Sequence, residues 1–153
     1  MAVQVELVGG NHIIQNLKKE VKSVVSNSMK GLIQVGFLIK ASSMRKTPID
    51  LGNLRASHYV VWGNGIDTDG AFVSTGNTKE DSRLAPDHQN MIALGKSQAG
   101  MFGVIVGVSA YYAIYVHENL QANHTVGQAK FLESAIGEYA PNALKIIKSK
   151  AKI

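Results

Sequence analysis

The stretch Ser109-Ala110-Tyr111-Tyr112-Ala113-Ile114-Tyr115-Val116-His117-Glu118 decides which fold we expect for this chain. It follows a strand-like run from Met101 to Val108 and holds three of the chain's five tyrosines. Tyrosine joins a large apolar ring to a polar hydroxyl, so a tyrosine cluster suits a contact surface or the half-wet edge of a core. The pattern predicts a strand, a tight turn, a short aromatic helix, a loop and a closing helix, in that order.

The closing helix is expected from Gln128 to about Lys152. Its apolar residues recur at helical spacing, and Pro141 is expected either to kink it or to split it in two. Four lysines crowd its end, where positive charge suits the negative end of the helix dipole: Lys145, Lys148, Lys150 and Lys152.

A longer helix is expected on the N-terminal side, over residues 11–45, after a short strand at 3–7. One apolar stripe follows it at three- and four-residue steps. Beyond Val35 the apolar residues spread around the helix, so its second half is expected to be buried more completely than its first. Glycine weakens a helix, and Gly31 and Gly36 are therefore expected to mark a bend or a close approach by another element.

The middle of the chain is expected to form strands. The dipeptide Thr47-Pro48 is expected to end the long helix, because the α region is disfavoured for the residue before a proline. Runs rich in β-forming residues at 58–62, 71–74 and 101–108 predict an antiparallel meander. Residues 76–100 are polar, rich in turn formers and without a sustained period, which predicts an inserted flexible loop.

Length and composition set the class of protein. A chain of 153 residues with 45% hydrophobic and 18% charged residues is typical of one globular domain, here residues 1–153, of the α+β class. It has no cysteine, which excludes disulfides and thiolate metal sites. We see no signal peptide and no membrane span, so a soluble protein is expected. The net charge of +5 modestly favours an acidic partner such as nucleic acid.

We find no pattern of residues that indicates catalysis. His117, Glu118 and His124 lack the spacing of a metal site on one helix, and an exposed helix end is the favoured interpretation. Ser109 lacks the flanking glycines of a hydrolase nucleophile. The expectation is a protein that is not an enzyme and uses no cofactor. A small metal-dependent hydrolase would require His117, Glu118 and His124 to converge.

Three ordered motifs resemble one known family. A Thr-Pro-x-Asp-x-Gly-x-Leu-Arg-x-Ser motif spans residues 47–57, and a Val-Gly segment leads into Tyr-Ala-x-Tyr-Val at 112–116. The start of the last helix, 128–132, departs from the family pattern by lacking the usual proline and carrying one extra residue. Together they resemble the tail-completion or head–tail connector (neck) proteins of long-tailed double-stranded-DNA bacteriophages. The resemblance covers nearly the whole chain except 76–100.

The resemblance implies a structural virion protein rather than an enzyme. It implies a fold similar to that of tail-terminator proteins, with both long helices packed on the meander. Its subunits would form a homo-oligomeric ring, expected as a hexamer, that joins the portal and stopper of the head to the major tail tube. DNA would pass through this ring without sequence-specific contacts. The protein would occur in the virion neck, and in the host cytoplasm during assembly.

The resemblance also implies roles for particular residues. Pro48 and Gly52 would set the turn after the long helix, and Asp50 has the side chain to cap the short helical turn that follows. Core packing is favoured over an interface role for Leu54 and Tyr112. The residues expected in the core are Leu54, Tyr112, Phe131 and Leu132. The residues expected at the subunit interface are Arg55, Tyr111, Tyr115, His117 and Glu118, with a possible Arg55–Glu118 ion pair. The residues that could face DNA are Lys145, Lys148, Lys150 and Lys152.

A basic nucleic-acid-binding module is the alternative function. It rests on the net charge of +5 and the lysine-rich end of the chain. No aromatic RNA-binding strand or recognition-helix pattern accompanies these lysines. The lysines favour binding to nucleic-acid phosphates without sequence preference. Such binding weakens steeply as the salt concentration rises.

Overall fold

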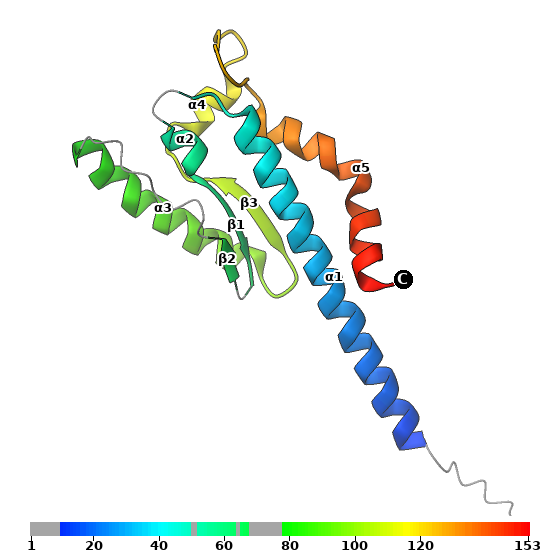
Figure 1. Ribbon diagram of the computed structural model, residues 1–153. Coiled ribbons are helices and arrows are strands. Elements are labelled where there is room, and N and C mark those ends of the chain that lie inside the picture. Colours follow the sequence, from blue (N-terminus) through cyan, green and yellow to red (C-terminus); the bar gives the residue numbers. More distant parts are fainter. Residues whose placement is uncertain (1–9, 50–51, 64, 68–77) are drawn as a thin grey trace, which may run out of the picture.

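The computed structural model describes residues 10–49, 52–63, 65–67 and 78–153, and it has an α+β fold (Figure 1). The helices and strands follow one another along the chain in this order: α1 (Gly10–Lys46), α2 (Asn53–Ala56), β1 (His58–Trp62), β2 (Gly65–Asp67), α3 (Thr78–Ala99), β3 (Val104–Val108), α4 (Ala113–Glu118) and α5 (Phe131–Ala151). In the described part of the chain, none of the helices combines membrane-spanning length with sufficient apolar character.

The sheet has three antiparallel strands in the order β2-β1-β3. His58 lies opposite Val108 and Trp62 opposite Val104, while the β2 end of the sheet pairs Trp62 with Gly65. The expected antiparallel pairing of 58–62 with the end of 101–108 is therefore confirmed, but the sheet is not a meander, because β3 pairs with β1 and not with β2. The expected strands at 3–7 and 71–74 lie outside the described residues, and the strand that pairs with the far side of β1 is β2.

Helices cover both faces of this sheet. Consecutive side chains of a strand point to opposite faces, and Val60 and Val61 are both fully buried. A Cβ atom placed on Gly36 of α1 would lie 3.2 Å from Val60 Cγ1. A Cβ atom placed on Gly95 of α3 would lie 3.0 Å from Val61 Cγ2. The sheet thus lies between α1 and α3, as Figure 1 shows.

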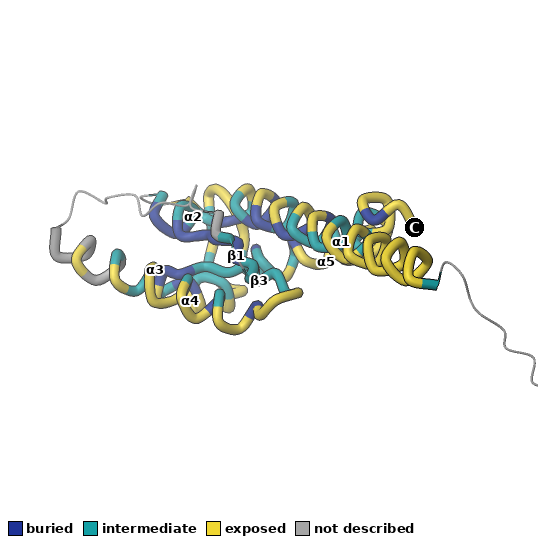
Figure 2. Tube along the Cα trace, turned by 90° about the horizontal axis from the view of Figure 1, so that it is seen from below, coloured by how far each residue is buried: buried dark blue, intermediate teal, exposed yellow. Residues whose placement is uncertain are grey.

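The long helix α1 is buried only over its second half, as expected. Its buried residues all lie from Gly31 onward, whereas every residue from 11 to 23 is exposed. Figure 2 shows this first part of α1 leaving the body of the molecule as an exposed rod. The expected extent of the helix, 11–45, agrees with the observed bounds to within one residue at each end.

The C-terminal helix α5 packs along the second half of α1. A Cβ atom on Gly31 would lie only 2.8 Å from the Cα of Ile147, so the two helix backbones approach closely at that point. The expected close approach at this glycine is confirmed. Pro141 lies inside α5 without dividing it, and the helix changes direction in Figure 1. Proline removes one backbone hydrogen bond and crowds the preceding turn, which accounts for the bend.

Polar contacts reinforce this helix pair near the end of α1. Ser42 Oγ and Lys46 Nζ each donate a hydrogen bond of 2.6 Å to Glu138 Oε2. The hydrogen bond from Lys46, and next that from Ser42, lower the pKa of Glu138 below its ordinary value. Glu138 is therefore ionised at neutral pH and joins α5 to α1.

The expected flexible loop at 76–100 is wrong, because residues 78–99 form the helix α3. The side of α3 that faces the sheet carries His88, Ile92, Gly95 and Ala99, at steps of four, three and four residues. Two of these are small and one is polar, so the helical period is present but is not apolar enough to show as a stripe. Pro86, which suggested a loop, is an exposed residue within α3.

Candidate functional site

The Thr-Pro motif forms a compact hydrogen-bonded corner at the end of α1. Thr47 is fully buried, and its Oγ1 donates to Ser43 O at 2.7 Å. Arg55 Nη2 donates to Thr47 O at 3.3 Å, and Ser57 Oγ donates to Leu54 O at 2.8 Å. The motif residues therefore bind one another's backbone and fix how α1 turns into α2. Their direct role in the chain is structural.

Glycine is required at two turns beside this corner. Gly52 precedes α2 with φ at +82°, a left-handed conformation that favours glycine, which fits its expected role in the turn. Gly127 has φ at +86°, and a Cβ atom there would lie 2.5 Å from Pro48 N. The loop before α5 is thereby held against the end of α1. Asp50, the expected cap, lies outside the described residues.

A buried histidine ties the corner to the sheet. His58 Nε2 lies 2.9 Å from Ser43 Oγ, and His58 Nδ1 lies 3.1 Å from Leu54 O. Because a carbonyl only accepts, the neutral ring with its proton on Nδ1 satisfies both contacts. Burial lowers the pKa of His58 to about 4, against the raising effect of the Arg55 and Leu54 carbonyls. His58 is therefore uncharged at neutral pH.

The core beside this corner gathers the residues that the family resemblance assigned to packing. Leu54, Ala110, Ala113 and Phe131 form one buried cluster, against which Tyr112 and Leu132 pack. Phe131 is 1% exposed, and its ring meets the edge of the His117 ring at a centroid distance of 4.8 Å. The expected core anchors Leu54 and Phe131 are thus buried, and Tyr112 packs on the core as favoured.

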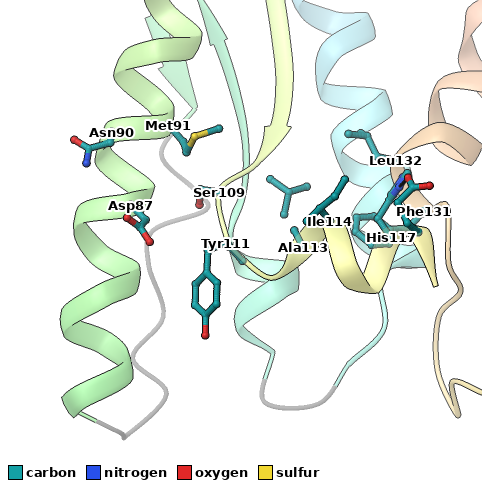
Figure 3. Close-up of a pocket in the computed structure, with 13 residues that line it drawn as sticks. Asp87, Asn90, Met91, Ser109, Tyr111, Ala113, Ile114, His117, Phe131 and Leu132 are labelled. Atoms are coloured by element: carbon teal, nitrogen blue, oxygen red, sulfur yellow. Dashed lines mark hydrogen bonds and ion pairs between the residues drawn. The ribbon is translucent and has the colours of Figure 1, made fainter. Parts of the chain in front are cut away.

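An open apolar groove lies directly above this cluster, with a volume of about 610 Å³. Figure 3 shows α3 on one side of it and α4 with the start of α5 on the other. Met91 lines the α3 side, Ile114 the α4 side and Leu132 the α5 side, with Tyr111 at the turn between them. We call this surface the α3–α4 groove. Its volume is in the range of sites that bury a ligand or an anchoring side chain.

The wall formed by α3 is fixed by His88. His88 Nδ1 is hydrogen-bonded to Ser109 Oγ at the end of β3, and its ring meets the edge of the Tyr59 ring at 6.5 Å. Burial, followed by the charge of Lys40, lowers the pKa of His88 below its ordinary value. Ser109 is itself 5% exposed and also donates to Ser57 O. These contacts position α3 against the end of β3, where Ser109 is one of the residues that line the groove.

The other wall carries large exposed side chains. Tyr111 is 54% exposed and Ile114 59%. Tyr115, which belongs to α4 but does not line the groove, is 74% exposed. Side chains of this size are usually covered in some part of a protein's working state, because leaving them in water is unfavourable. Tyr111 and Tyr115, assigned to a subunit interface by the resemblance, therefore have the exposure that such a role requires. Whether another subunit covers them stays a prediction.

Charged residues close the end of the groove. Lys130 Nζ lies 2.6 Å from Glu118 Oε2, and His117 Nδ1 lies 2.7 Å from Glu118 Oε1. The hydrogen bond from Lys130, and then that from His117, lower the pKa of Glu118; the Glu118 contact in turn raises the pKa of Lys130. The suggested Arg55–Glu118 pair is not formed within the chain, because Arg55 binds the Thr47 carbonyl and Glu118 is paired with Lys130.

The remaining candidate residues do not form a chemical site. Among the described residues, no three side chains of the His, Cys, Asp or Glu type gather to hold a metal ion, so His117, Glu118 and His124 do not converge. The four lysines near the end of α5 are all exposed. These lysines contribute to the long-range electrostatic field of the protein, and they do not form a binding pocket of their own.

Sequence reasoning missed the α3 side of the groove. Asp87, Asn90 and Met91 line it, but residues 76–100 were expected to be a loop. A usable signal was present in His88, Ile92, Gly95 and Ala99, whose spacing is helical once small residues are counted as buried. With that helix in place, the tyrosine-rich stretch would have been recognised as one wall of a groove rather than a flat surface.

No protein-family model, curated protein or solved structure matches this chain.

Proposed function

We propose that this protein is a structural subunit of a bacteriophage neck, which assembles with its own copies into a ring between the head and the tail. The observation that carries the proposal is the α3–α4 groove, which is lined by exposed Tyr111 and Ile114. An apolar groove bordered by exposed aromatic side chains is the kind of surface that anchors a protein partner. In the proposed role, the partners are other copies of the chain, the stopper and the major tail tube protein, and the protein resides in the virion.

The internal contacts of the motif residues support this role indirectly. The Thr-Pro corner and the buried Phe131 hold α1, α4 and α5 in one body, which leaves the groove and the exposed first part of α1 at the surface. A subunit that binds by shape needs such a rigid frame, since a contact of fixed rotation repeated from copy to copy closes into a ring. The ordered motifs that resemble the neck family supply the assignment to a phage particle.

Native mass spectrometry and negative-stain electron microscopy test the proposal. The purified chain is expected to form closed rings at high protein concentration or on addition of its neck partners, and the protein is expected in purified virions. A chain that stays monomeric under both conditions and is absent from virions would contradict the proposal.

A basic nucleic-acid-binding role is the second candidate, supported by the exposed lysines of α5. Gly31 contacts the helix segment around Ile147 and Lys150, so Lys30 of α1 shares this end of the molecule. We expect weak retention on duplex DNA that falls steeply as salt increases, because phosphate contacts release counterions. The variant Lys148→Gln/Lys150→Gln is expected to reduce the salt dependence, while Lys18→Gln/Lys19→Gln, far along α1, removes the same charge and serves as the comparison. If the chain shows no retention on DNA at low salt, this role is excluded.

A further inference from the structure

The first part of α1 has an apolar face without a partner among the described residues. We call residues 11–23 of α1 the arm; every one of them is exposed. Ile14 is 51% exposed, Leu17 63% and Val21 55%, at steps of three and four residues, so they form one stripe. Thirteen helical residues extend about 20 Å. A helix that stays in solvent on all sides usually carries polar residues all around. The apolar stripe of the arm therefore indicates that another surface covers it.

The arm cannot reach the groove of its own chain. In Figure 1 the N-terminal end of α1 lies at the opposite end of the molecule from α4, which forms one wall of the α3–α4 groove. The helix between these two ends is continuous. A contact between the arm and the groove therefore joins two different copies.

The arm and the groove match in shape and in charge. Helices that bind in apolar grooves insert side chains at positions i, i+3 and i+7, which is the spacing of Ile14, Leu17 and Val21. The arm carries more lysine than glutamate, with Lys18, Lys19 and Lys22 against Glu20. Two acidic residues line the groove, Asp87 and Glu118. Glu118 is already paired with Lys130, so Asp87 on the α3 side is the acidic residue that the lysines of the arm would meet.

We propose that the arm of one copy docks in the α3–α4 groove of the next copy. This inference rests on the proposed ring and names the contact that builds it. The two faces of this contact differ, so each copy gives its arm to one neighbour and its groove to the other. Such a head-to-tail contact propagates around a ring, whereas a contact between two identical faces stops at a dimer.

Two interface-disrupting variants test the docking by native mass spectrometry. Leu17→Glu places a charge on the apolar stripe of the arm and leaves the groove intact. Ile114→Glu places a charge in the groove and leaves the arm intact. Both side chains are exposed, so neither change is expected to disturb the fold of the single chain, which circular dichroism checks. Gln15→Glu, on the opposite side of the arm, is the matched control and is expected to assemble like the unmodified chain.

The expected result is specific to a head-to-tail contact. Each variant alone is monomeric, whereas an equal mixture of the two gives mixed dimers and nothing larger, because only one intact arm–groove pair remains. As a check on position, Leu17→Cys chains mixed with Ile114→Cys chains are expected to give a disulfide-linked mixed dimer. The chain has no cysteine of its own, so the linkage is unambiguous.

Other outcomes overturn the docking in identifiable ways. If Ile114→Glu still assembles while Leu17→Glu does not, or if Leu17→Cys links only to itself, two arms pair with each other instead. If both variants form rings, the ring stands but uses other surfaces. If the unmodified chain is monomeric both at high concentration and with its neck partners, the docking is wrong. Its presence in purified virions would still uphold the proposed neck role, and its absence would remove both.

Discussion

Replacing Phe131 with alanine is expected to lower the free energy of unfolding by about 3–5 kcal/mol, the usual cost of emptying a buried aromatic site. The ring is 1% exposed and belongs to the cluster with Leu54, Ala110 and Ala113. It also contacts the His58 ring at a centroid distance of 5.8 Å. Its loss leaves a cavity where α5 meets α2 and α4, which these neighbours fill only in part. Urea unfolding followed by circular dichroism, at one low protein concentration, measures the effect.

Two comparison variants make this prediction decisive. Ile136→Ala lies on the same helix at a side chain that is 46% exposed, and it is expected to cost less than about 1 kcal/mol. If Phe131→Ala fails to fold, Phe131→Leu retains most of the volume and is expected to fold with an intermediate loss. A loss for Phe131→Ala that equals the loss for Ile136→Ala would show that the cluster does not hold α5 in place.

Stability is expected to fall as the pH decreases from about 6.5 toward 4, because His58 is kept neutral in the folded chain. Burial lowers its pKa from the ordinary 6.5 to about 4. Between these values the unfolded chain takes up a proton that the folded chain does not. The stabilisation is therefore complete above the unfolded pKa and is lost as the pH falls, by up to about 3 kcal/mol. Urea unfolding at a series of pH values measures the slope.

The variant His58→Gln isolates this histidine from the other titrating groups. The glutamine amide cannot be protonated in this range, so the slope between pH 6.5 and 4 is expected to shrink. His88, whose pKa burial also lowers, adds a slope of the same sign, and His88→Gln measures its share. The lowered pKa values of Glu118 and Glu138 act at lower pH, since their carboxylates are lost only as the pH falls through those values. An unchanged slope in His58→Gln would contradict the assignment.

The sequence predicted the frame of the fold better than its functional surface. The stripe of α1 and the residues of α5 are strongly apolar and periodic, so both helices and their burial followed from spacing alone. The helix α3 was not predicted. Gly95 packs against Val61 and Tyr59 of β1, and Ala99 is buried, at positions where larger apolar residues would have revealed the period. A helix that binds a sheet through small residues leaves little hydrophobic signal.

The individual site residues divide in the same way. Leu54 and Phe131 were recognisable because an apolar residue within a motif has one common use, which is packing. The partner of Glu118 could not be predicted in this way, because no sequence pattern relates Glu118 to a basic residue. Glu118 pairs with Lys130 rather than with Arg55, because the loop before α5 folds back and brings Lys130 beside it. The groove itself depends on His88 meeting Ser109 across 21 positions of the chain, a contact that no local pattern contains.

The sheet between α1 and α3 separates two properties of this protein. One face of the sheet is covered by the α1–α5 pair, whereas α3 covers the opposite face, where Gly95 lies over the buried Tyr59 and Val61. Replacing the exposed groove-lining side chains of α3, Asn90 and Met91, therefore changes the groove while Tyr59 and Val61 stay covered. In the proposed assembly, the choice of partner could then change without a large cost to folding.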